Sequence, residues 1–383
     1  MEQNNIAFLF GIHGSIQDIL EKTNGDYKRV SEFFIIKKMS KEYDNVFVFS
    51  HDKKRFKNLF PDNTYHYRLF NQILFLSLGW IILLFSIHKK RIRWVYLESS
   101  ALPLIFIINR FSNAKVLLNY NYLLYKVYET ERNPKSFKNI LSKNRFMPFF
   151  VRVLEKSLIR YVDYIIAASK EIERFVPKAK VLNYRIGIRK GIIIREFRPD
   201  KTKKHKIFTT IIGPTVLSTS RLTKMKNPFL LLRAYEIAKR RIPDLNLIFA
   251  GEGDLMDECR KISDSDVYFL GFERNIPSLL KGADVFVLSS LYDPSPRSLI
   301  EAMAMGTPSI ATNVGGVSDY LDDTCGILIE PGNPEKLANK IEYIIKNKKI
   351  ARILGKRARN KILKYHDLEK NMNILIDFMK KNI

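Results

Sequence analysis

A short segment, residues 293–301, contains the residue types from which an anion site can be built. Ser295 is suited to cap a helix and Pro296 to be its first residue, which predicts a helix that begins there. The first backbone amides of this helix would lack partners within it, so they could bind a diphosphate. These are the amides of Arg297, Ser298 and Leu299.

Glu301 follows one turn later on the same predicted helix. A carboxylate there could accept two hydrogen bonds from the neighbouring hydroxyls of a ribose. Alternatively, Glu301 only complements the helix dipole, and the segment alone does not separate these two interpretations.

A pair of cations, Arg221 and Lys226, lies in the loop after the strand predicted at 215–219. The planar fork of an arginine and the point charge of a lysine together suit a diphosphate. In a chain this basic, surface solvation is the competing interpretation. Their position beyond the end of a strand favours a binding site.

The elements that must position these residues alternate between strands and helices. Apolar runs predict buried strands, and apolar spacing of three and four predicts helices such as Pro228–Arg241. The predicted strands are 6–10, 46–50, 94–97, 116–119, 164–168, 215–219, 245–250, 267–270, 285–289, 308–311 and 327–329. This alternation predicts parallel sheets covered on both faces, with ligands beyond the carboxyl ends of the strands. The lysine-rich stretch 197–206, which contains Pro199, is predicted to be a linker.

Charge is distributed unevenly along the chain. The net charge is +26, of which residues 1–200 carry +17. Residues 131–160 combine eight Lys or Arg with two acidic residues, and aromatic and methionine side chains are interleaved: Phe137, Phe146, Met147, Phe149 and Phe150. This composition suits an anionic membrane surface, although a solvated basic face would share it. No recognised nucleic-acid motif occurs, so no nucleic-acid partner is expected.

Cysteine content and apolar segments bear on the cellular compartment. Only Cys259 and Cys325 occur, which favours a cytoplasmic protein without a disulfide framework. No signal peptide is evident. The apolar stretch 73–87 is shorter than the ~20 residues of a spanning helix, so a buried or interfacial helix is expected.

No metal cofactor is expected. The histidines and cysteines lack zinc-ligand spacing. Asp264 and Asp266 are similar to a metal-binding acidic triplet, but they directly precede a predicted strand, which favours a turn.

Further motifs occur in order after Arg221 and Lys226. They are Gly251-Glu252-Gly253-Asp254, Gly271-Phe272, residues 283–290, residues 293–301 and Gly315-Gly316. This series resembles the retaining GT-B glycosyltransferases of group 1 (family 4), strongly over 214–345, weakly over 164–199, and over 1–160 only in element order. The resemblance implies two facing Rossmann-like, doubly wound domains with an interdomain cleft. They are expected at 1–198, joined by the C-terminal helix 366–383, and at 199–365.

The resemblance also implies roles for individual residues. Arg221 and Lys226 would hold the donor diphosphate, Glu301 the ribose, and Asp293 would approach the donor sugar. The family usually has Glu where Asp293 stands, so this carboxylate is shorter by one methylene. Three further donor contacts are implied: Glu252, Asn121 (where the family often has His) and Gly25, for which a plain turn glycine is the alternative.

The activity implied is transfer of a sugar, with retained configuration and without a metal, from a nucleotide diphosphate sugar to a glycan or lipid-linked hydroxyl. Cell-surface polysaccharide or glycolipid synthesis, at the inner face of the membrane, would be the setting. Two alternatives stay open. One is a nonhydrolysing nucleotide-sugar epimerase of the same fold. The other is a catalytically silent nucleotide-sugar binding protein, which the departures at Asp293 and Asn121 make thinkable.

Overall fold

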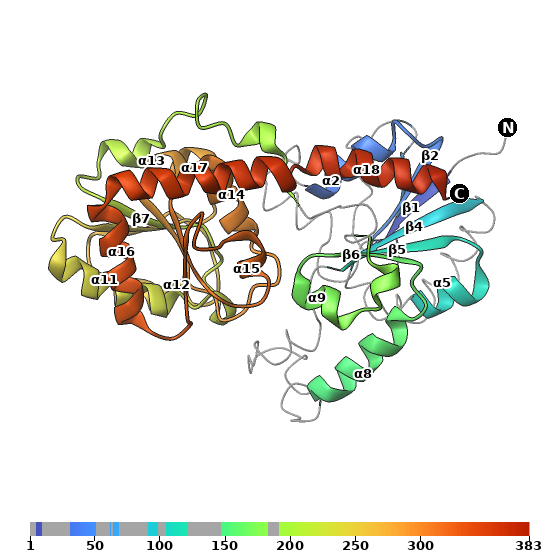
Figure 1. Cartoon of the computed structure of the whole chain (residues 1–383), viewed down its shortest axis with the longest axis horizontal. Helices are drawn as coiled ribbons and strands as arrows, with labels where there is room; N and C mark the ends of the chain where they lie inside the picture. Colours follow the sequence, from blue (N-terminus) through green and yellow to red (C-terminus); the bar gives the residue numbers. More distant parts are fainter. Residues whose placement is uncertain are drawn as a thin grey trace. The chain divides into compact units, whose positions relative to one another are not determined.

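The computed structural model describes residues 5–9, 31–50, 62, 64–68, 91–98, 105–120, 147–182 and 191–382. The chain divides into two compact units (Figure 1). The N-terminal unit comprises Met1–Glu129, Pro134–Lys190 and Leu368–Ile383, and the C-terminal unit comprises Thr130–Asn133 and Gly191–Asp367. Each is built on its own parallel sheet.

The N-terminal sheet has the order β3-β2-β1-β4-β5-β6, and every neighbouring pair is parallel. Its strands are β1 (Asn5–Leu9), β2 (Asn45–Ser50), β3 (Thr64–Arg68), β4 (Ile92–Glu98), β5 (Lys115–Tyr120) and β6 (Tyr164–Ala167). Buried apolar residues of β4 and β5 form the centre of its core. The reversal of strand order between β1 and β4 defines a doubly wound sheet.

The structure describes five α-helices in this unit. They are α2 (Ser31–Met39), α5 (Ile105–Phe111), α8 (Met147–Ile159), α9 (Lys170–Phe175) and α18 (Leu368–Lys381). The last of these comes from the far end of the chain and packs on α2, and Lys380 Nζ lies 2.6 Å from Oε2 of Glu42, shortly after α2. The C-terminal helix therefore completes the N-terminal unit.

The C-terminal sheet has the order β12-β11-β10-β7-β8-β9, again with parallel pairs throughout. Its strands are β7 (Thr215–Ser218), β8 (Asn246–Phe249), β9 (Val267–Phe269), β10 (Val285–Leu288), β11 (Ser309–Thr312) and β12 (Ile327–Ile329). The order reverses between β7 and β10, as it does between β1 and β4.

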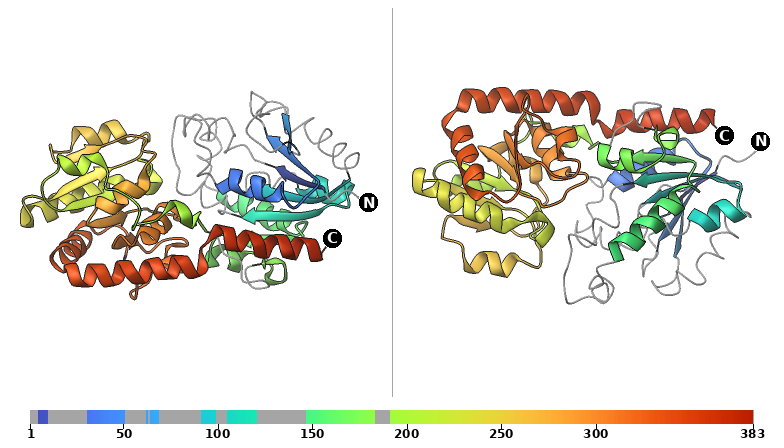
Figure 2. Two further views of the ribbon diagram at one scale, coloured as in Figure 1. Left: turned by 90° about the horizontal axis from the view of Figure 1, so that it is seen from above. Right: turned by 60° about the horizontal axis from the view of Figure 1, so that its bottom comes forward.

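Helices cover both faces of this second sheet (Figure 2). They are α11 (Pro228–Arg241), α12 (Met256–Lys261), α13 (Ile276–Gly282), α14 (Arg297–Met305), α15 (Val317–Tyr320), α16 (Pro334–Lys346) and α17 (Lys348–Tyr365). Successive strand residues point to opposite faces, so Val216 packs with α11 and α16 while Leu217 packs with α13 and α14. The continuous apolar strands follow from this burial on both sides.

The predicted α/β class, the parallel sheets and the strands are confirmed, with strand ends shifted by at most two residues. One strand, β3, was not predicted. Its sequence, Thr-Tyr-His-Tyr-Arg, lacks an apolar run because β3 lies at the edge of the sheet. The stretch 73–87 lies outside the described residues. Within the described ranges, no helix has both the length and the apolarity needed to cross a bilayer.

The prediction of a linker at 197–206 was wrong at its beginning. Phe197 is buried in the core of the C-terminal unit with Ile192, and Arg359 donates to the carbonyl of Phe197 (2.9 Å). The lysines that suggested a linker lie on the outside of this packed segment. The units consequently divide at Lys190–Gly191, rather than at the predicted 198–199.

Candidate nucleotide-sugar donor site

The candidate site lies at the carboxyl ends of β7 and β10. These two strands are neighbours at the point where the strand order of the C-terminal sheet reverses. Loops that leave neighbouring strands at such a switch point separate and leave room for a ligand. The loop after β7 carries Arg221 and Lys226, and the loop after β10 carries Asp293. The topology therefore brings the two predicted motifs to one place.

Hydrogen bonds to backbone carbonyls hold these two loops together. The Ser289 hydroxyl donates within 3.0 Å of the carbonyls of Lys226 and Asn227, and the Leu291 amide donates to the Met225 carbonyl at 2.8 Å. Asn227 adopts a left-handed conformation (φ 48°) directly before Pro228, the first residue of α11. The position of Lys226 is thus set by backbone geometry. Ser289 was not among the predicted site residues, although its place directly after an apolar strand was a usable signal.

Lys226 and Asp293 form the central ion pair of the site. Lys226 Nζ lies 2.5 Å from Asp293 Oδ2, and the two side chains are only 17% and 6% exposed. The Gly316 amide donates to the Asp293 carbonyl at 2.9 Å. A Cβ on Gly315, which has φ +56°, would lie 2.5 Å from that same carbonyl oxygen, so only glycine fits there.

Helix α14 begins one residue later than predicted. Pro296 occupies the N-cap position, and its side chain makes no capping hydrogen bond. The reason lies in the preceding turn, where Asp293 Oδ1 accepts from the Ser295 amide (3.3 Å). The first turn of α14 contains no acidic residue, so its positive end suits an anion. The Ser298 hydroxyl lies 3.4 Å from that of Ser220, so this helix end lies beside the loop that carries Arg221.

Glu301 lies in the second turn of α14 and is 15% exposed. Its Oε1 accepts from Arg297 Nε at 3.1 Å. Burial raises the pKa of the Glu301 carboxyl, and the Arg297 guanidinium partly opposes this rise. The Arg297 side chain therefore pairs with Glu301, whereas the sequence predicted a role only for the Arg297 backbone amide.

The loop that carries Arg221 packs tightly on the loop after β8. The Leu222 amide donates to the Glu252 carbonyl, and the Leu255 amide donates to the Leu222 carbonyl, both at 3.0 Å. A Cβ on Gly253 would lie 2.2 Å from the Leu222 carbonyl oxygen, so glycine is required for this close approach.

Unpaired polar groups gather at these same strand ends. In the described part of the chain, no side chain forms an ion pair or hydrogen bond with the exposed Arg221 guanidinium. The hydroxyls of Thr219 and Ser290 are buried there without a hydrogen-bond partner among the described residues. Such groups suit a polar, anionic ligand.

The structure describes only one of the three further predicted donor contacts, Glu252. Glu252 is exposed, and its Oε1 accepts from the Phe272 amide (3.3 Å), which ties the β8 loop to the β9 loop. Gly25 and Asn121 lie outside the described residues.

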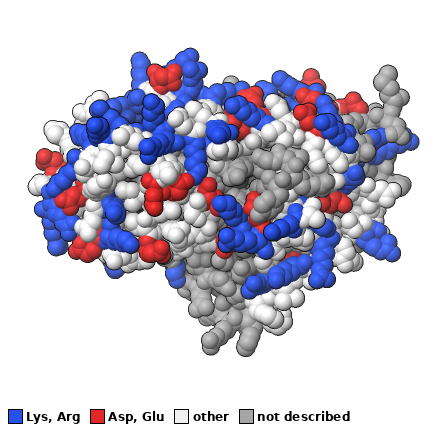
Figure 3. All heavy atoms as spheres, viewed as in Figure 1, with Lys and Arg blue, Asp and Glu red and all other residues white. Residues whose placement is uncertain are grey.

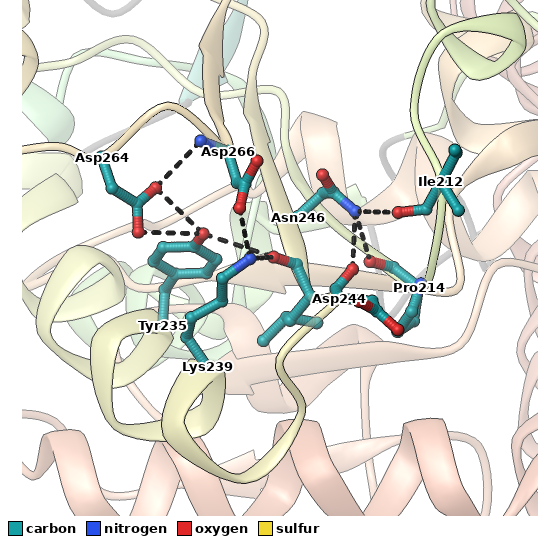
Figure 4. A network of polar contacts seen from close by, with 9 residues as sticks. Ile212, Pro214, Tyr235, Lys239, Asp244, Asn246, Asp264 and Asp266 are labelled. Atoms are coloured by element: carbon teal, nitrogen blue, oxygen red, sulfur yellow. Dashed lines mark hydrogen bonds and ion pairs between the residues drawn. The ribbon is translucent and has the colours of Figure 1, made fainter.

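Asp264 and Asp266 are both engaged in the fold, as Figure 4 shows. Asp264 accepts from the Tyr235 hydroxyl at 3.1 Å, and Asp266 accepts from Lys239 Nζ at 2.5 Å. Burial, reinforced by the Asp264 carboxylate, raises the pKa of the Tyr235 phenol and keeps it a donor. These contacts join α11 to the start of β9, in agreement with the predicted turn. Among the residues that the structure describes, no cluster of three or more His, Cys, Asp or Glu is placed to hold a metal ion.

The architecture and this site define a class of protein: the fold is that of the GT-B glycosyltransferases, and its second unit carries a helix N-terminus and two cations at the switch point. Residues 200–361 match the family described as "Glycosyl transferases group 1". These residues, which belong to the C-terminal unit, are therefore similar to that family.

Two curated relatives illustrate the match. The UDP-Gal:alpha-D-GlcNAc-diphosphoundecaprenol alpha-1,3-galactosyltransferase of Escherichia coli is 30% identical over 57% of this chain and 54% of its own length. The lipopolysaccharide core biosynthesis glycosyltransferase LpsE of Rhizobium meliloti (strain 1021) is 27% identical over 41% of this chain and 47% of its own. The chain therefore spans about half the length of the curated relatives it matches.

A solved structure is similar over almost the whole chain. The Anabaena protein Alr3699/HepE, in complex with UDP and glucose, aligns with a TM-score of 0.74 and 19% identity, covering 99% of this chain and 100% of that protein. This similarity shows the fold.

Proposed function

We propose that this chain transfers a sugar from a nucleotide diphosphate sugar to a hydroxyl acceptor, with retention of anomeric configuration. The observation that carries the proposal is that Arg221, Lys226 and the N-terminus of α14 lie together at the switch point. Each of these groups favours the negative charge of a diphosphate, which increases as the sugar leaves.

The chemistry required of the protein is mainly electrostatic. The bond between the anomeric carbon and the diphosphate oxygen breaks, and a bond to the acceptor oxygen forms on the same face of the sugar. The acceptor proton passes to the departing diphosphate, so the step needs no separate protein base. Arg221 and Lys226 stabilise the leaving group, Glu301 holds the ribose, and Asp293 faces the sugar.

The ion pair of Lys226 with Asp293 gives donor binding a definite consequence. A diphosphate that approaches Lys226 competes with the Asp293 carboxylate for the same ammonium group. As Lys226 turns to phosphate, Asp293 becomes available to sugar hydroxyls. One event thereby couples recognition of the diphosphate to recognition of the sugar.

The proposed donor is a UDP-sugar, and the proposed acceptor is a lipid-linked glycan in cell-surface polysaccharide or glycolipid synthesis. The names of two relatives support this choice. One is a galactosyltransferase that uses UDP-galactose and a diphosphoundecaprenol-linked acceptor, and the other is a glycosyltransferase of lipopolysaccharide core biosynthesis. The N-terminal unit would bind the acceptor at the inner face of a membrane. No metal would be required.

Incubation of the full chain with radiolabelled UDP-glucose, UDP-galactose and UDP-N-acetylglucosamine, with and without a bacterial membrane extract, tests the proposal. We expect label to appear in a lipid-extractable product only when the extract is present. The R221A variant is the matched control and should form product at least about tenfold more slowly. An isomerised donor without acceptor would indicate an epimerase, and binding without any product would indicate a silent binding protein.

A further inference from the structure

Helix α8 of the N-terminal unit carries large apolar side chains on its solvent side. Phe149, Phe150, Val153 and Leu154 are between 48% and 64% exposed. At 3.6 residues per turn, these four side chains lie within a sector of roughly 140° on one side of the helix. A helix that only covers a sheet would turn such residues inward.

The opposite side of α8 is fixed to the sheet. Glu155 is 1% exposed, and its Oε1 accepts from the Tyr120 hydroxyl at 2.8 Å. Ile159, on the same side, is part of the core of the unit. The helix therefore cannot bury its outward apolar side by turning about its axis, because it would then lose these contacts.

The charges exposed on α8 and just after it are all positive. Arg152, Lys156 and Arg160 are exposed, whereas the acidic residue of this stretch, Glu155, faces the sheet. At 3.6 residues per turn, Arg152 and Lys156 flank the apolar sector on one side. Figure 3 shows Lys and Arg in broad patches on the visible surface, with Asp and Glu in smaller ones.

The exposed apolar surface continues onto α5, which packs beside α8 (Figures 1 and 2). Tyr161, just after α8, meets the exposed Phe106 of α5 edge to face, with ring centroids 5.1 Å apart. Aromatic rings with a polar tip or a cationic neighbour are typical of side chains at the boundary between lipid headgroups and acyl chains.

We infer that the α8 surface, defined as Phe149, Phe150, Val153 and Leu154 with Arg152, Lys156 and Arg160, lies in the headgroup region of an anionic bilayer. The apolar side chains enter the acyl boundary, and the three cations pair with lipid phosphates. The inference rests on the proposed function, because a lipid-linked acceptor would have to be met at such a surface. A second copy of the chain is a poorer occupant, since a two-fold contact would bring cations against cations.

Flotation of the full chain with vesicles tests the inference. We expect binding to vesicles of phosphatidylcholine and phosphatidylglycerol, and at least tenfold weaker binding to phosphatidylcholine alone. Each cation near an anionic surface is worth roughly fivefold, so R152Q/K156Q/R160Q should weaken binding by about a hundredfold. High salt should have a similar effect on the wild type, because the Debye length falls from about 8 Å to about 3 Å at 1 M salt.

A second variant tests the apolar part separately. F149S/F150S should weaken binding at least about tenfold at every salt concentration, because it removes buried apolar area and no charge. K201Q/K203Q/K204Q removes the same number of cations from the C-terminal unit and is the matched control, with unchanged binding expected. Circular dichroism should show the same helix content for all variants, since every substituted α8 side chain is exposed.

A UDP-glucose thermal shift, measured on the same samples, separates this inference from the proposed function. The α8 inference is wrong if the wild type does not bind anionic vesicles, or if both α8 variants bind them as the wild type does. If UDP-glucose still gives a thermal shift in that case, the proposed donor site is unaffected. If vesicle binding follows the expected pattern but no UDP-sugar gives a shift, the proposed function is wrong instead. An F149S/F150S variant that loses self-association but keeps vesicle binding would show that a second copy covers α8.

Discussion

The two units have sheets of the same design, with strand order reversing between β1 and β4 in one and between β7 and β10 in the other, yet they present different chemistry. In the C-terminal unit, the charged side chains of Lys226 and Asp293 are largely buried, and backbone hydrogen bonds join the loops that carry them. In the N-terminal unit, α8 turns phenylalanines to solvent and a carboxylate to the core. The comparison teaches that loops and outer faces, more than the sheet, determine what each unit can bind.

The largest effect is expected where the C-terminal unit has buried its charge. R221A and K226A should each lower turnover at least about tenfold, because each removes a charge-assisted contact to the leaving diphosphate. They should differ in stability. K226A leaves the buried Asp293 unpaired and should cost up to about 3–5 kcal/mol in the free energy of unfolding, whereas R221A, at an exposed side chain, should cost little.

Steady-state kinetics and urea unfolding of both variants check this pair of expectations. K346A, which removes an exposed cation paired with Glu342 on α16, is the control and should change neither quantity appreciably. Activity near that of wild type in both R221A and K226A would refute the diphosphate assignment.

A smaller effect is expected from a substitution that forces apart two loops of the candidate donor site. G253A places a Cβ against the Leu222 carbonyl and should lower the free energy of unfolding by about 1–3 kcal/mol. Because Arg221 precedes Leu222 in the displaced loop, the UDP-sugar thermal shift should fall as well. The control is G332A, where a Cβ meets nothing within 4 Å although φ is +91°. It should lose some stability through backbone strain but keep donor binding, and equal loss of donor binding in both variants would argue against a specific role for the β8 loop.

The pH dependence of donor binding should be more modest. Burial raises the pKa of Glu301, so the carboxyl takes up a proton above the ordinary glutamate range. Donor affinity should therefore fall several-fold as pH is lowered through that raised pKa, because the protonated form accepts ribose hydrogen bonds less well. The free energy of unfolding should change in the opposite direction. It should fall as pH rises through the raised pKa, because the buried carboxyl must then ionise in the folded state.

Calorimetric titration of UDP between pH 5 and pH 8 measures this effect. E301Q should bind more weakly than wild type and lose this part of the pH dependence. A wild-type profile that matches E301Q would show that Glu301 serves only the helix dipole.

No effect at all is expected from removing divalent metal ions. The amides of α14 and two cations can neutralise a diphosphate without a metal. Turnover should be the same in excess chelator as in buffer. Loss of activity in chelator that added Mg²⁺ or Mn²⁺ restores would reopen a metal role for Asp264 and Asp266, despite their contacts with Tyr235 and Lys239.

How far the sequence predicts this protein differs from element to element. Strands buried on both faces, such as β10, are uninterrupted apolar runs and can be read directly, whereas the edge strand β3 carries a mixed pattern and was missed. The resemblance that names Arg221, Lys226 and Glu301 depends on motifs in order along the chain, and the topology then brought the loops that carry them to one edge of one sheet.

The sequence by itself determined the α/β class, the parallel sheets and the family resemblance, and it named the residues of the candidate donor site, because apolar periodicity and motif spacing are local properties of the chain. Only the tertiary structure decided that Lys226 pairs with Asp293, that Gly253 must lie against Leu222, and that Glu155 turns inward while Phe149 and Phe150 turn outward. The physical reason is that these relations join residues distant in sequence or depend on which side of a helix meets the sheet. Spacing along a chain does not specify either one.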